Sequence, residues 1–479
     1  MNAIAHSAAP AETACEKSLS WRKAAWLAMI AVASFHLAYL IPWLAILIIA
    51  FQAALFALAP LKTGRQAFYL GLVIGLAIYV PQLSFFWTLF HRGAIPLWII
   101  LSCWLAFFIV LGRLCLRRFG FIAWACAAPV VWLGVEYFRS ELYYLKFSWL
   151  TVGYTFSQTP LLPYFSAFGL YGTGFVLMCL VSVVAVFPRI NNSWRVAAVS
   201  ALALVFLFPF VALKTKNGAA KVRVAGIQFE FALPAEIRLA LDDAVKKYPQ
   251  TDLFVLSEYS FMGPPPPLIT KWCQFHHKYV VAGGEDPQPD GNYYNVAYVI
   301  GPDGSVVFHQ AKCVPVQLMR DGLAAQNQRV WNSPWGKIGL CICYDASYAR
   351  VTDALVREGA QALIVPTMDV TDWGRRQHQL HGRVGPMRAA EYGVPMFRLC
   401  SSGISQLIAK SGVVTATAPY PGQGALISGD LNLIDSKGRI PPDRYLGPPS
   451  AAFTALLAAF FAFDPFLFSR VSRATRFSS

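Results

Sequence analysis

Charged residues are scarce in this 479-residue chain. They occupy 14% of its positions, whereas 56% are hydrophobic, and ordinary soluble proteins carry about 25% charged residues. This balance excludes an ordinary soluble enzyme and indicates a membrane protein. The long apolar runs lie before about residue 213 and again at 450–469, while residues 218–447 have the mixed composition of a soluble α/β domain.

Regularly spaced cysteine pairs are also missing. Four of the ten cysteines lie in apolar runs and Cys15 lies in the N-terminal tail, which leaves five, an odd number without regular spacing. This pattern gives no disulfide framework. A zinc site from Cys341, Cys343 and either His276 or His277 has no CxxC pair to support it, so we expect no metal and no other cofactor.

The net charge of +15 does not indicate a nucleic-acid partner, because much of it flanks the apolar runs. Basic residues placed in this way report the orientation of a chain in a membrane. The residues concerned are Lys62, Arg65, Arg113, Arg117, Arg118, Arg189, Arg195, Arg470, Arg473 and Arg476.

Eight apolar segments approach the roughly 20 residues that a membrane-spanning helix requires. They lie at 23–40, 43–60, 67–90, 95–113, 121–139, 161–187, 195–213 and 450–469. We therefore expect a membrane domain with seven spans at 1–213 and an eighth span at 450–469. The positive-inside rule puts both termini, including the basic tail 470–479, in the cytoplasm and residues 214–449 outside.

Two segments near the membrane have more than one interpretation. Residues 31–33 resemble a signal-peptide cleavage site, but the first apolar run is longer than a signal core, which favours a retained span. The loop at 140–160 is rich in aromatic residues, which favour the headgroup level of a bilayer. We expect it to lie along the outer membrane surface, as an anchoring belt or as part of a substrate site.

Strand-like and helix-like segments alternate in residues 218–447, which predicts a layered α/β domain. We expect strands at 222–229, 252–258, 279–283, 294–300, 305–312, 336–343, 361–367, 394–400 and 404–410. We expect helices at 234–247, 268–278, 348–358 and 378–391.

Three residues at predicted strand ends form a candidate catalytic set, because such ends gather functional groups in layered α/β folds. Cys343 follows a strand at a turn, where a thiol is available as a nucleophile. Glu258 is the candidate base, since apolar neighbours raise the pKa of a buried carboxyl toward neutrality. Lys312 and the backbone amide of Tyr344 are the candidates for stabilising an oxyanion.

The order of several motifs resembles the carbon–nitrogen hydrolase (nitrilase) superfamily. They are VLSEYSF at 255–261, YYNVAYVIGPDG at 293–304, a lysine beside VP at 312–315, GLCICYD at 339–345, MRAAEYGVP at 387–395 and SSGIS at 401–405. With eight spans around them, the chain is similar to the apolipoprotein N-acyltransferase family. This resemblance implies a multi-span α-helical membrane domain joined to a nitrilase-like αββα sandwich outside the membrane.

The resemblance also implies the chemistry. A Glu-Lys-Cys triad would consist of Glu258, Lys312 and Cys343. The cysteine would take an acyl chain from a phospholipid as a thioester and pass it to the N-terminal amine of a lipid-modified lipoprotein cysteine. The location implied is the bacterial cytoplasmic (inner) membrane, with the catalytic domain on the periplasmic face.

Two motifs depart from the family pattern, at three positions. Where the family reads YxKRHLVPFGE, this chain reads FHQAKCVPVQL at 308–318, so alignment on VP puts Gln310 at the family lysine and leaves Lys312 two residues late. Because side chains alternate along a strand, Gln310 and Lys312 would project from the same face. Both residues therefore remain candidates for the lysine position. Leu318 replaces the glutamate of FGE, and Asp345 replaces that of CYE. These changes keep two alternatives open: a divergent membrane amidase or acyltransferase with another acceptor, and a catalytically silent lipid-binding assembly protein.

The candidates for oxyanion and substrate binding are Tyr344, Asp345, Trp373 and His378. The last two lie in DVTDWGRRQHQLH at 369–381, where the family places a loop near its active site, and they are candidates for a lipid headgroup pocket. The alternative for His378 is that it holds this loop in place, together with Arg388. Glu391 is expected to be a buried stabilising residue.

Overall fold

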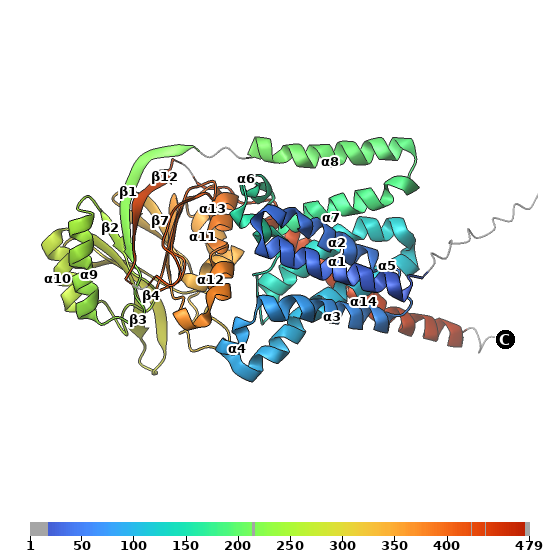
Figure 1. Ribbon diagram of the computed structural model, residues 1–479, viewed down its shortest axis with the longest axis horizontal. Coiled ribbons are helices and arrows are strands. Elements are labelled where there is room, and N and C mark those ends of the chain that lie inside the picture. Colours follow the sequence, from blue (N-terminus) through green and yellow to red (C-terminus); the bar gives the residue numbers. More distant parts are fainter. Residues whose placement is uncertain (1–17, 213–215, 423, 436, 475–479) are drawn as a thin grey trace, which may run out of the picture.

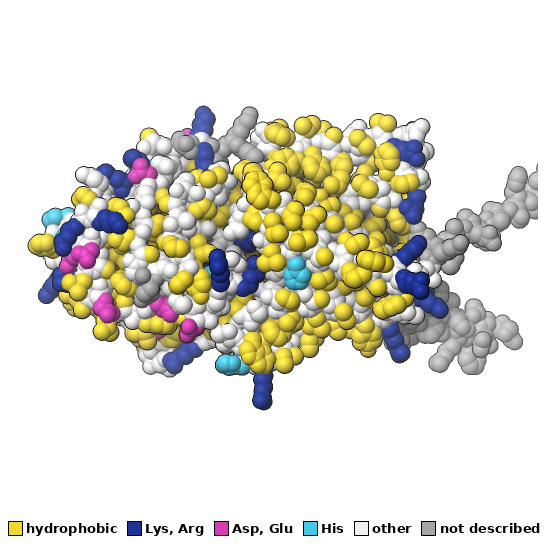
Figure 2. Space-filling model, in the orientation of Figure 1, with side chains coloured by type: hydrophobic (Ala, Val, Ile, Leu, Met, Phe, Trp, Pro, Cys, Tyr) yellow, Lys and Arg dark blue, Asp and Glu magenta, His cyan; other side chains and the backbone are white. Residues whose placement is uncertain are grey.

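The structure of the protein is a computed structural model that describes residues 18–212, 216–422, 424–435 and 437–474. A helical bundle occupies one end of the long axis and a sandwich of two sheets occupies the other (Figure 1). Hydrophobic side chains cover the visible face of the bundle, and Lys and Arg gather at its end away from the sheets (Figure 2). This distribution is that of a membrane domain with a water-exposed domain attached to it.

The bundle contains long apolar helices. They are α1 Trp21–Leu40, α2 Ile48–Ala57 with the 3-10 turn Pro42–Leu47 before it, α3 Gly64–Gln82, α5 Ala94–Tyr137, α7 Leu170–Val186, α8 Asn192–Ala212 and α14 Asp443–Ala474. Six helical stretches of the described chain are long and apolar enough to cross a membrane. One of them is residues 85–142, which bends at Gly120, where φ is 85°, and so contains two of the eight predicted spans.

Some predicted spans differ from the observed helices. The segment at 67–90 breaks after Gln82, and the short helix α4 (Phe85–Phe90) follows it. The segment at 161–187 begins with the short helices α6 Leu162–Phe165 and Ser166–Phe168. Gly169, with a φ of 88°, separates them from α7. The number of spans and their orientation remain predictions.

Most aromatic side chains of the loop at 140–160 are buried within the protein and so do not form the anchoring belt that the sequence suggested. The loop contains the π-helical turn Phe138–Leu142 and the 3-10 turn Val152–Gln158. Trp149 is 5% exposed and Phe156 is fully buried. Ser148 and Trp149 both donate hydrogen bonds to Ser347 of the sandwich domain. The aromatic residues therefore pack between the two domains, although Tyr144 is exposed.

Two six-stranded sheets form the sandwich. One contains β1 Asn217–Ile227, β2 Leu253–Val255, β3 Tyr279–Pro287, β4 Tyr293–Ile300, β5 Val306–Ala311 and β12 Leu426–Ile434, in the order β12-β1-β2-β3-β4-β5. The other contains β6 Val330–Ser333, β7 Gly336–Leu340, β8 Ala362–Thr367, β9 Met396–Cys400, β10 Gln406–Ile408 and β11 Val414–Thr417, in the order β11-β10-β9-β8-β7-β6. The centre of each sheet is parallel: β1, β2 and β3 in one, and β7, β8 and β9 in the other.

Helices cover the outer faces of both sheets (Figure 1). Helices α9 (Pro234–Lys247) and α10 (Pro267–His276) lie on the first sheet, and α11 (Ala349–Arg357), α12 (Arg375–His381) and α13 (Val384–Tyr392) lie between the second sheet and the bundle. The αββα architecture and the membrane domain are therefore confirmed. The helix predicted at 378–391 is two helices, and β6, β11 and β12 were not predicted.

Alternating side chains build the layers of the sandwich. In β1, Val224 faces the core that the two sheets share, and Ala225 faces the cluster beneath α9. In β2, Leu253 and Val255 face the shared core and Phe254 faces the helices. The period of two in a strand produces this arrangement. The candidate residues Glu258, Lys312 and Cys343 follow the ends of β2, β5 and β7.

Candidate active site

Cys343 lies at a sharp turn between β7 and α11. It begins the 3-10 turn Cys343–Ser347 and has a φ of 50°, a backbone region that residues other than glycine and asparagine seldom adopt. Strained conformations of this kind are held where the surrounding structure over-determines them, commonly at functional sites. The residue is 6% exposed, and its Sγ lies 3.7 Å from the carbonyl oxygen of Met368.

Glu258 and Lys312 meet beside this turn. The Lys312 ammonium lies 2.8 Å from Glu258 Oε1, and both residues are buried. The same carboxylate accepts hydrogen bonds from Asn295 Nδ2 at 2.7 Å and from the backbone N–H of Met368 at 2.8 Å. Gly283 in β3 lets its backbone lie close to that of Glu258, because a Cβ on Gly283 would lie 2.5 Å from the Cα of Glu258.

Burial governs the protonation of this cluster. It raises the pKa of the Glu258 carboxyl, against the opposing effect of the Lys312 ammonium. It also raises the pKa of the Cys343 thiol, and the nearby Glu258 carboxylate raises it further. The resting nucleophile is therefore a thiol, and it needs a base at the moment of attack.

Lys312, not Gln310, contributes to this cluster. The Gln310 amide lies in β5 and binds backbone groups only: it donates to Ala311 O and Asn327 O and accepts from the Arg329 N–H. Lys312 is one residue beyond the end of β5 and turns toward Glu258. The end of the strand therefore separates two side chains that a continuous strand would place on one face.

Asp321 is a third member of the cluster that the sequence did not single out. Its Oδ2 lies 2.7 Å from the Lys312 ammonium. It also accepts hydrogen bonds from Tyr259 Oη, Asn295 Nδ2 and the Val316 N–H. Although burial opposes ionisation, Lys312 holds the pKa of Asp321 below its ordinary value. The sequence did contain a signal for Asp321. It lies three residues after Leu318, which stands at the position of the family glutamate, just as Lys312 lies two residues after the position of the family lysine.

Two of the four predicted binding residues line the cavity at Cys343, namely Tyr344 and Trp373. The other two do not line it. The Asp345 carboxylate instead accepts hydrogen bonds from the N–H groups of Ile342, Cys313 and Val314, which ties the Cys343 turn to the segment after Lys312. The ring of His378 stacks on Tyr420, with 4.0 Å between centroids, and binds the Val370 carbonyl.

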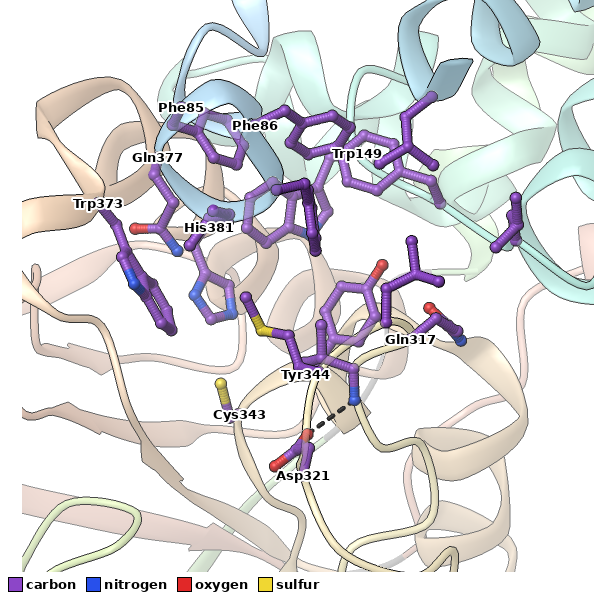
Figure 3. A pocket seen from close by; sticks show the side chains of 18 of the residues that line it. Phe85, Phe86, Trp149, Gln317, Asp321, Cys343, Tyr344, Trp373, Gln377 and His381 are labelled. Carbon is purple, nitrogen blue, oxygen red and sulfur yellow. Dashed lines mark hydrogen bonds between the residues drawn. The ribbon is translucent and has the colours of Figure 1, made fainter. Parts of the chain in front are cut away.

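The cavity has a volume of about 220 Å³ and lies at the junction of the two domains. Figure 3 shows Phe85 and Phe86 on one side and Cys343 and Asp321 on the other. The apolar wall comes from α4, α5 and the loop before Val152, and includes Phe85, Phe86, Leu89, Phe90, Leu97, Ile100, Leu101, Phe147 and Trp149. The arrangement places an apolar surface against a thiol, a carboxylate and an ammonium.

Glu391 is fully buried against two arginines. Its carboxylate pairs with Arg388 and with Arg444 at 2.8 Å, and it accepts the backbone N–H of Leu170. Arg388 in turn donates to the carbonyls of Ala346 and Ser347. These contacts hold the turn after Cys343 in place. Among the described residues, no group of three or more histidine, cysteine or acidic side chains is arranged to hold a metal ion.

Comparison with known proteins gives matches over both domains. The family described as the apolipoprotein N-acyltransferase N-terminal domain matches residues 24–184, and the carbon-nitrogen hydrolase family matches residues 237–436. Apolipoprotein N-acyltransferase of Geobacter metallireducens is 24% identical over 436 residues, which are 78% of this chain and 82% of that protein. Apolipoprotein N-acyltransferase of Azotobacter vinelandii is 24% identical over 478 residues, 84% of this chain and 89% of that protein.

Two further matches cover less than half of this chain. Omega-amidase NIT2-B of Xenopus laevis is 25% identical over 183 residues, 34% of this chain and 64% of that protein. The crystal structure of Nit3 of Saccharomyces cerevisiae, a member of the nitrilase superfamily, is similar with a TM-score of 0.39 and 19% identity, and covers 44% of this chain and 90% of that one.

Proposed function

This chain belongs to the apolipoprotein N-acyltransferase family and is a lipoprotein N-acyltransferase; we propose that it works by ping-pong transfer through Cys343. The acyl chain would leave a phospholipid, reside on Cys343 as a thioester, and pass to the N-terminal amine of a lipid-modified lipoprotein cysteine. The observation that carries this proposal is the cavity, where Cys343, Glu258 and Lys312 face an apolar wall from the membrane helices.

In the first half-reaction, Glu258 removes the thiol proton as Sγ attacks the carbonyl carbon of the phospholipid ester. The developing oxyanion is stabilised by the Lys312 ammonium and the Tyr344 backbone N–H. When the tetrahedral intermediate collapses, the bond to the glycerol oxygen breaks. Glu258 then returns its proton to that oxygen, and the lysophospholipid leaves.

In the second half-reaction, the amine nitrogen attacks the thioester carbonyl carbon at the same position. The new C–N bond forms, the C–S bond breaks, and one amine proton reaches the sulfur through Glu258. The same oxyanion site serves both steps, because both attacks give a tetrahedral intermediate on Cys343. The apolar wall keeps the acyl chain in place between the steps and limits access of water to the thioester.

We place the sandwich domain on the periplasmic face of the bacterial cytoplasmic membrane, with both termini in the cytoplasm. The segments at 61–66 and 114–120, which threading the spans from a cytoplasmic N-terminus puts in the cytoplasm, meet at the end of the bundle away from the sheets. Arg113 and Arg117 both donate to the carbonyl oxygen of Lys62, at 3.0 Å and 2.7 Å. Lys and Arg side chains gather at that end in Figure 2, as the positive-inside rule requires of a cytoplasmic face.

The test is to purify the protein with phospholipid present and to measure its intact mass. We expect a hydroxylamine-labile acyl adduct, which a diacylglyceryl-cysteine peptide then discharges. Cys343→Ala should lack the adduct. Cys341→Ala is the matched control, because Cys341 is fully buried two residues away and outside the cavity lining, and it should keep the adduct.

Other outcomes would contradict the proposal in distinguishable ways. An adduct that the peptide does not discharge would indicate another acceptor. Release of ammonia from small amides without an adduct would indicate an amidase. Identical behaviour of the wild type and Cys343→Ala in all three assays would leave only a lipid-binding role.

A further inference from the structure

His381 is a buried histidine beside the nucleophile that the mechanism above does not use. It is the last residue of α12, it is 2% exposed, and it lines the cavity with Cys343. Its ring stacks on Trp149, with 4.9 Å between centroids and 29° between the planes. Figure 3 shows the imidazole on the Cys343 side of Trp149.

The two ring nitrogens have different surroundings. Nδ1 lies 2.7 Å from Asp369 Oδ1. Nε2 is buried and has no hydrogen-bond partner within the part of the chain that the structure describes. A buried polar atom without a partner is costly, and one in the lining of a substrate cavity indicates that a ligand completes its hydrogen bonding.

The surroundings of Asp369 settle which nitrogen carries the proton. Asp369 also accepts hydrogen bonds from Arg398 Nη2 at 2.7 Å and Gln377 Nε2 at 2.9 Å. Although burial opposes ionisation, His381 and Arg398 hold the pKa of Asp369 well below its ordinary range. Burial lowers the pKa of His381 to about 4. The imidazole is therefore neutral near pH 7, Nδ1–H donates to the carboxylate, and Nε2 has a free lone pair.

An acceptor at this position distinguishes the two half-reactions. In the first, the group that leaves the carbonyl carbon is a glycerol oxygen with developing negative charge, which a lone pair on Nε2 repels. In the second, the group that arrives is an amine, whose N–H is a donor. The free lone pair therefore matches the chemistry of the amine and not that of the departing alkoxide.

We propose that His381 binds the acceptor substrate: its Nε2 accepts a hydrogen bond from the incoming amine and aims the nitrogen lone pair at the thioester carbonyl. This inference rests on the proposed function. One N–H stays on the nitrogen and becomes the amide N–H of the product, and the other proton goes through Glu258 to the sulfur. His381 itself gains and loses no proton.

The test separates the half-reactions in two variants. His381→Asn keeps a donor for Asp369 but lacks an atom at the Nε2 position, whereas His381→Gln restores a polar group there. We expect His381→Asn to form the thioester within about 3-fold of the wild-type rate and to discharge it to a diacylglyceryl-cysteine peptide about 10-fold more slowly, the effect of one lost hydrogen bond. His381→Gln should recover most of the discharge rate.

His378→Asn is the matched control, because His378 lies one turn earlier on α12 and outside the cavity lining. It should leave the ratio of the two rates unchanged. The ethanolamine headgroup of a donor phospholipid also carries an N–H, whereas a choline headgroup carries none. Thioester formation by His381→Asn should therefore be measured with both donors. A loss of rate with the ethanolamine donor alone would show that His381 binds the donor headgroup and would overturn the proposal.

Equal losses in both half-reactions without rescue by Gln would also overturn it, since they would indicate a purely structural histidine. A wild-type discharge rate in His381→Asn would overturn it directly. These outcomes are separate from failure of the proposed function, in which the wild-type protein itself forms no adduct on Cys343.

Discussion

Replacing Asp321 with Asn removes one of the two carboxylates that hold the Lys312 ammonium. The Lys312–Asp321 contact is 2.7 Å long and buried. A hydrogen bond between charged groups contributes about 2 kcal/mol, so we expect kcat/KM for thioester formation to fall about 30-fold if the contact is needed at the transition state.

The pH dependence gives a second, independent readout of Asp321→Asn. Burial raises the pKa of Glu258, Lys312 lowers it, and the Asp321 charge raises it again. Removing that charge therefore lowers the pKa of Glu258. Because Glu258 acts as a base only when ionised, activity is lost as the pH falls through its pKa, and the acid limb of the pH–rate profile should move to lower pH.

The assay is the rate of appearance of the acyl adduct by intact mass, measured across pH for the wild type, Asp321→Asn and Asp321→Glu. The glutamate variant keeps the charge with one extra methylene and should retain most of the rate. Wild-type kcat/KM in Asp321→Asn, or an acid limb that moves to higher pH, would refute the reasoning.

Four further variants test neighbouring parts of the structure. Lys312→Ala should abolish the adduct, whereas Gln310→Ala should lower stability by about 1–2 kcal/mol and leave an active enzyme; equal, mild losses of activity would contradict this assignment. Folding lowers the pKa of His381 to about 4 from an unfolded value of about 6.5. The neutral imidazole therefore contributes stability that is lost as the pH falls from about 6.5 toward 4. The difference in Tm between pH 7 and pH 5 should be smaller in His381→Asn than in the wild type. The Asp443 carboxylate accepts hydrogen bonds from the N–H groups of Tyr171 and Gly172 at the start of α7. Asp443→Asn should therefore lower stability by about 1–2 kcal/mol in thermal unfolding. An unchanged Tm would contradict that role.

The sequence predicted the chemistry of the site better than its geometry. Glu258, Lys312 and Cys343 each follow a strand, and the fold brings their side chains together. Asp321 was missed because it lies in a loop, where no periodic pattern reports which way a side chain points. The chain turns at Val316–Met319, and the Val316 N–H donates to the Asp321 carboxylate, which holds Asp321 beside Lys312.

Asp345 and His378 do not line the cavity, although the resemblance to the family motifs at 339–345 and 369–381 made both of them candidates. In a 3-10 turn or a helix, neighbouring residues point in different directions, so Asp345 turns toward backbone amides and His381, not His378, faces the cavity. Sequence spacing alone did not distinguish the two histidines.

The contacts of the loop at 140–160 make the nucleophile dependent on the membrane domain. Ser148 Oγ and Trp149 Nε1 donate to Ser347, at 2.9 Å and 3.0 Å, at the end of the turn that Cys343 begins. The hydroxyls of Tyr344 and Tyr348 donate to the Lys146 carbonyl from either side of Ser347. Because Cys343 has an unfavourable backbone conformation, these contacts help to hold it there. The sandwich domain without its helices would therefore lose both the apolar wall of the cavity and the support of the turn, so lipid binding and presentation of the nucleophile depend on one interface.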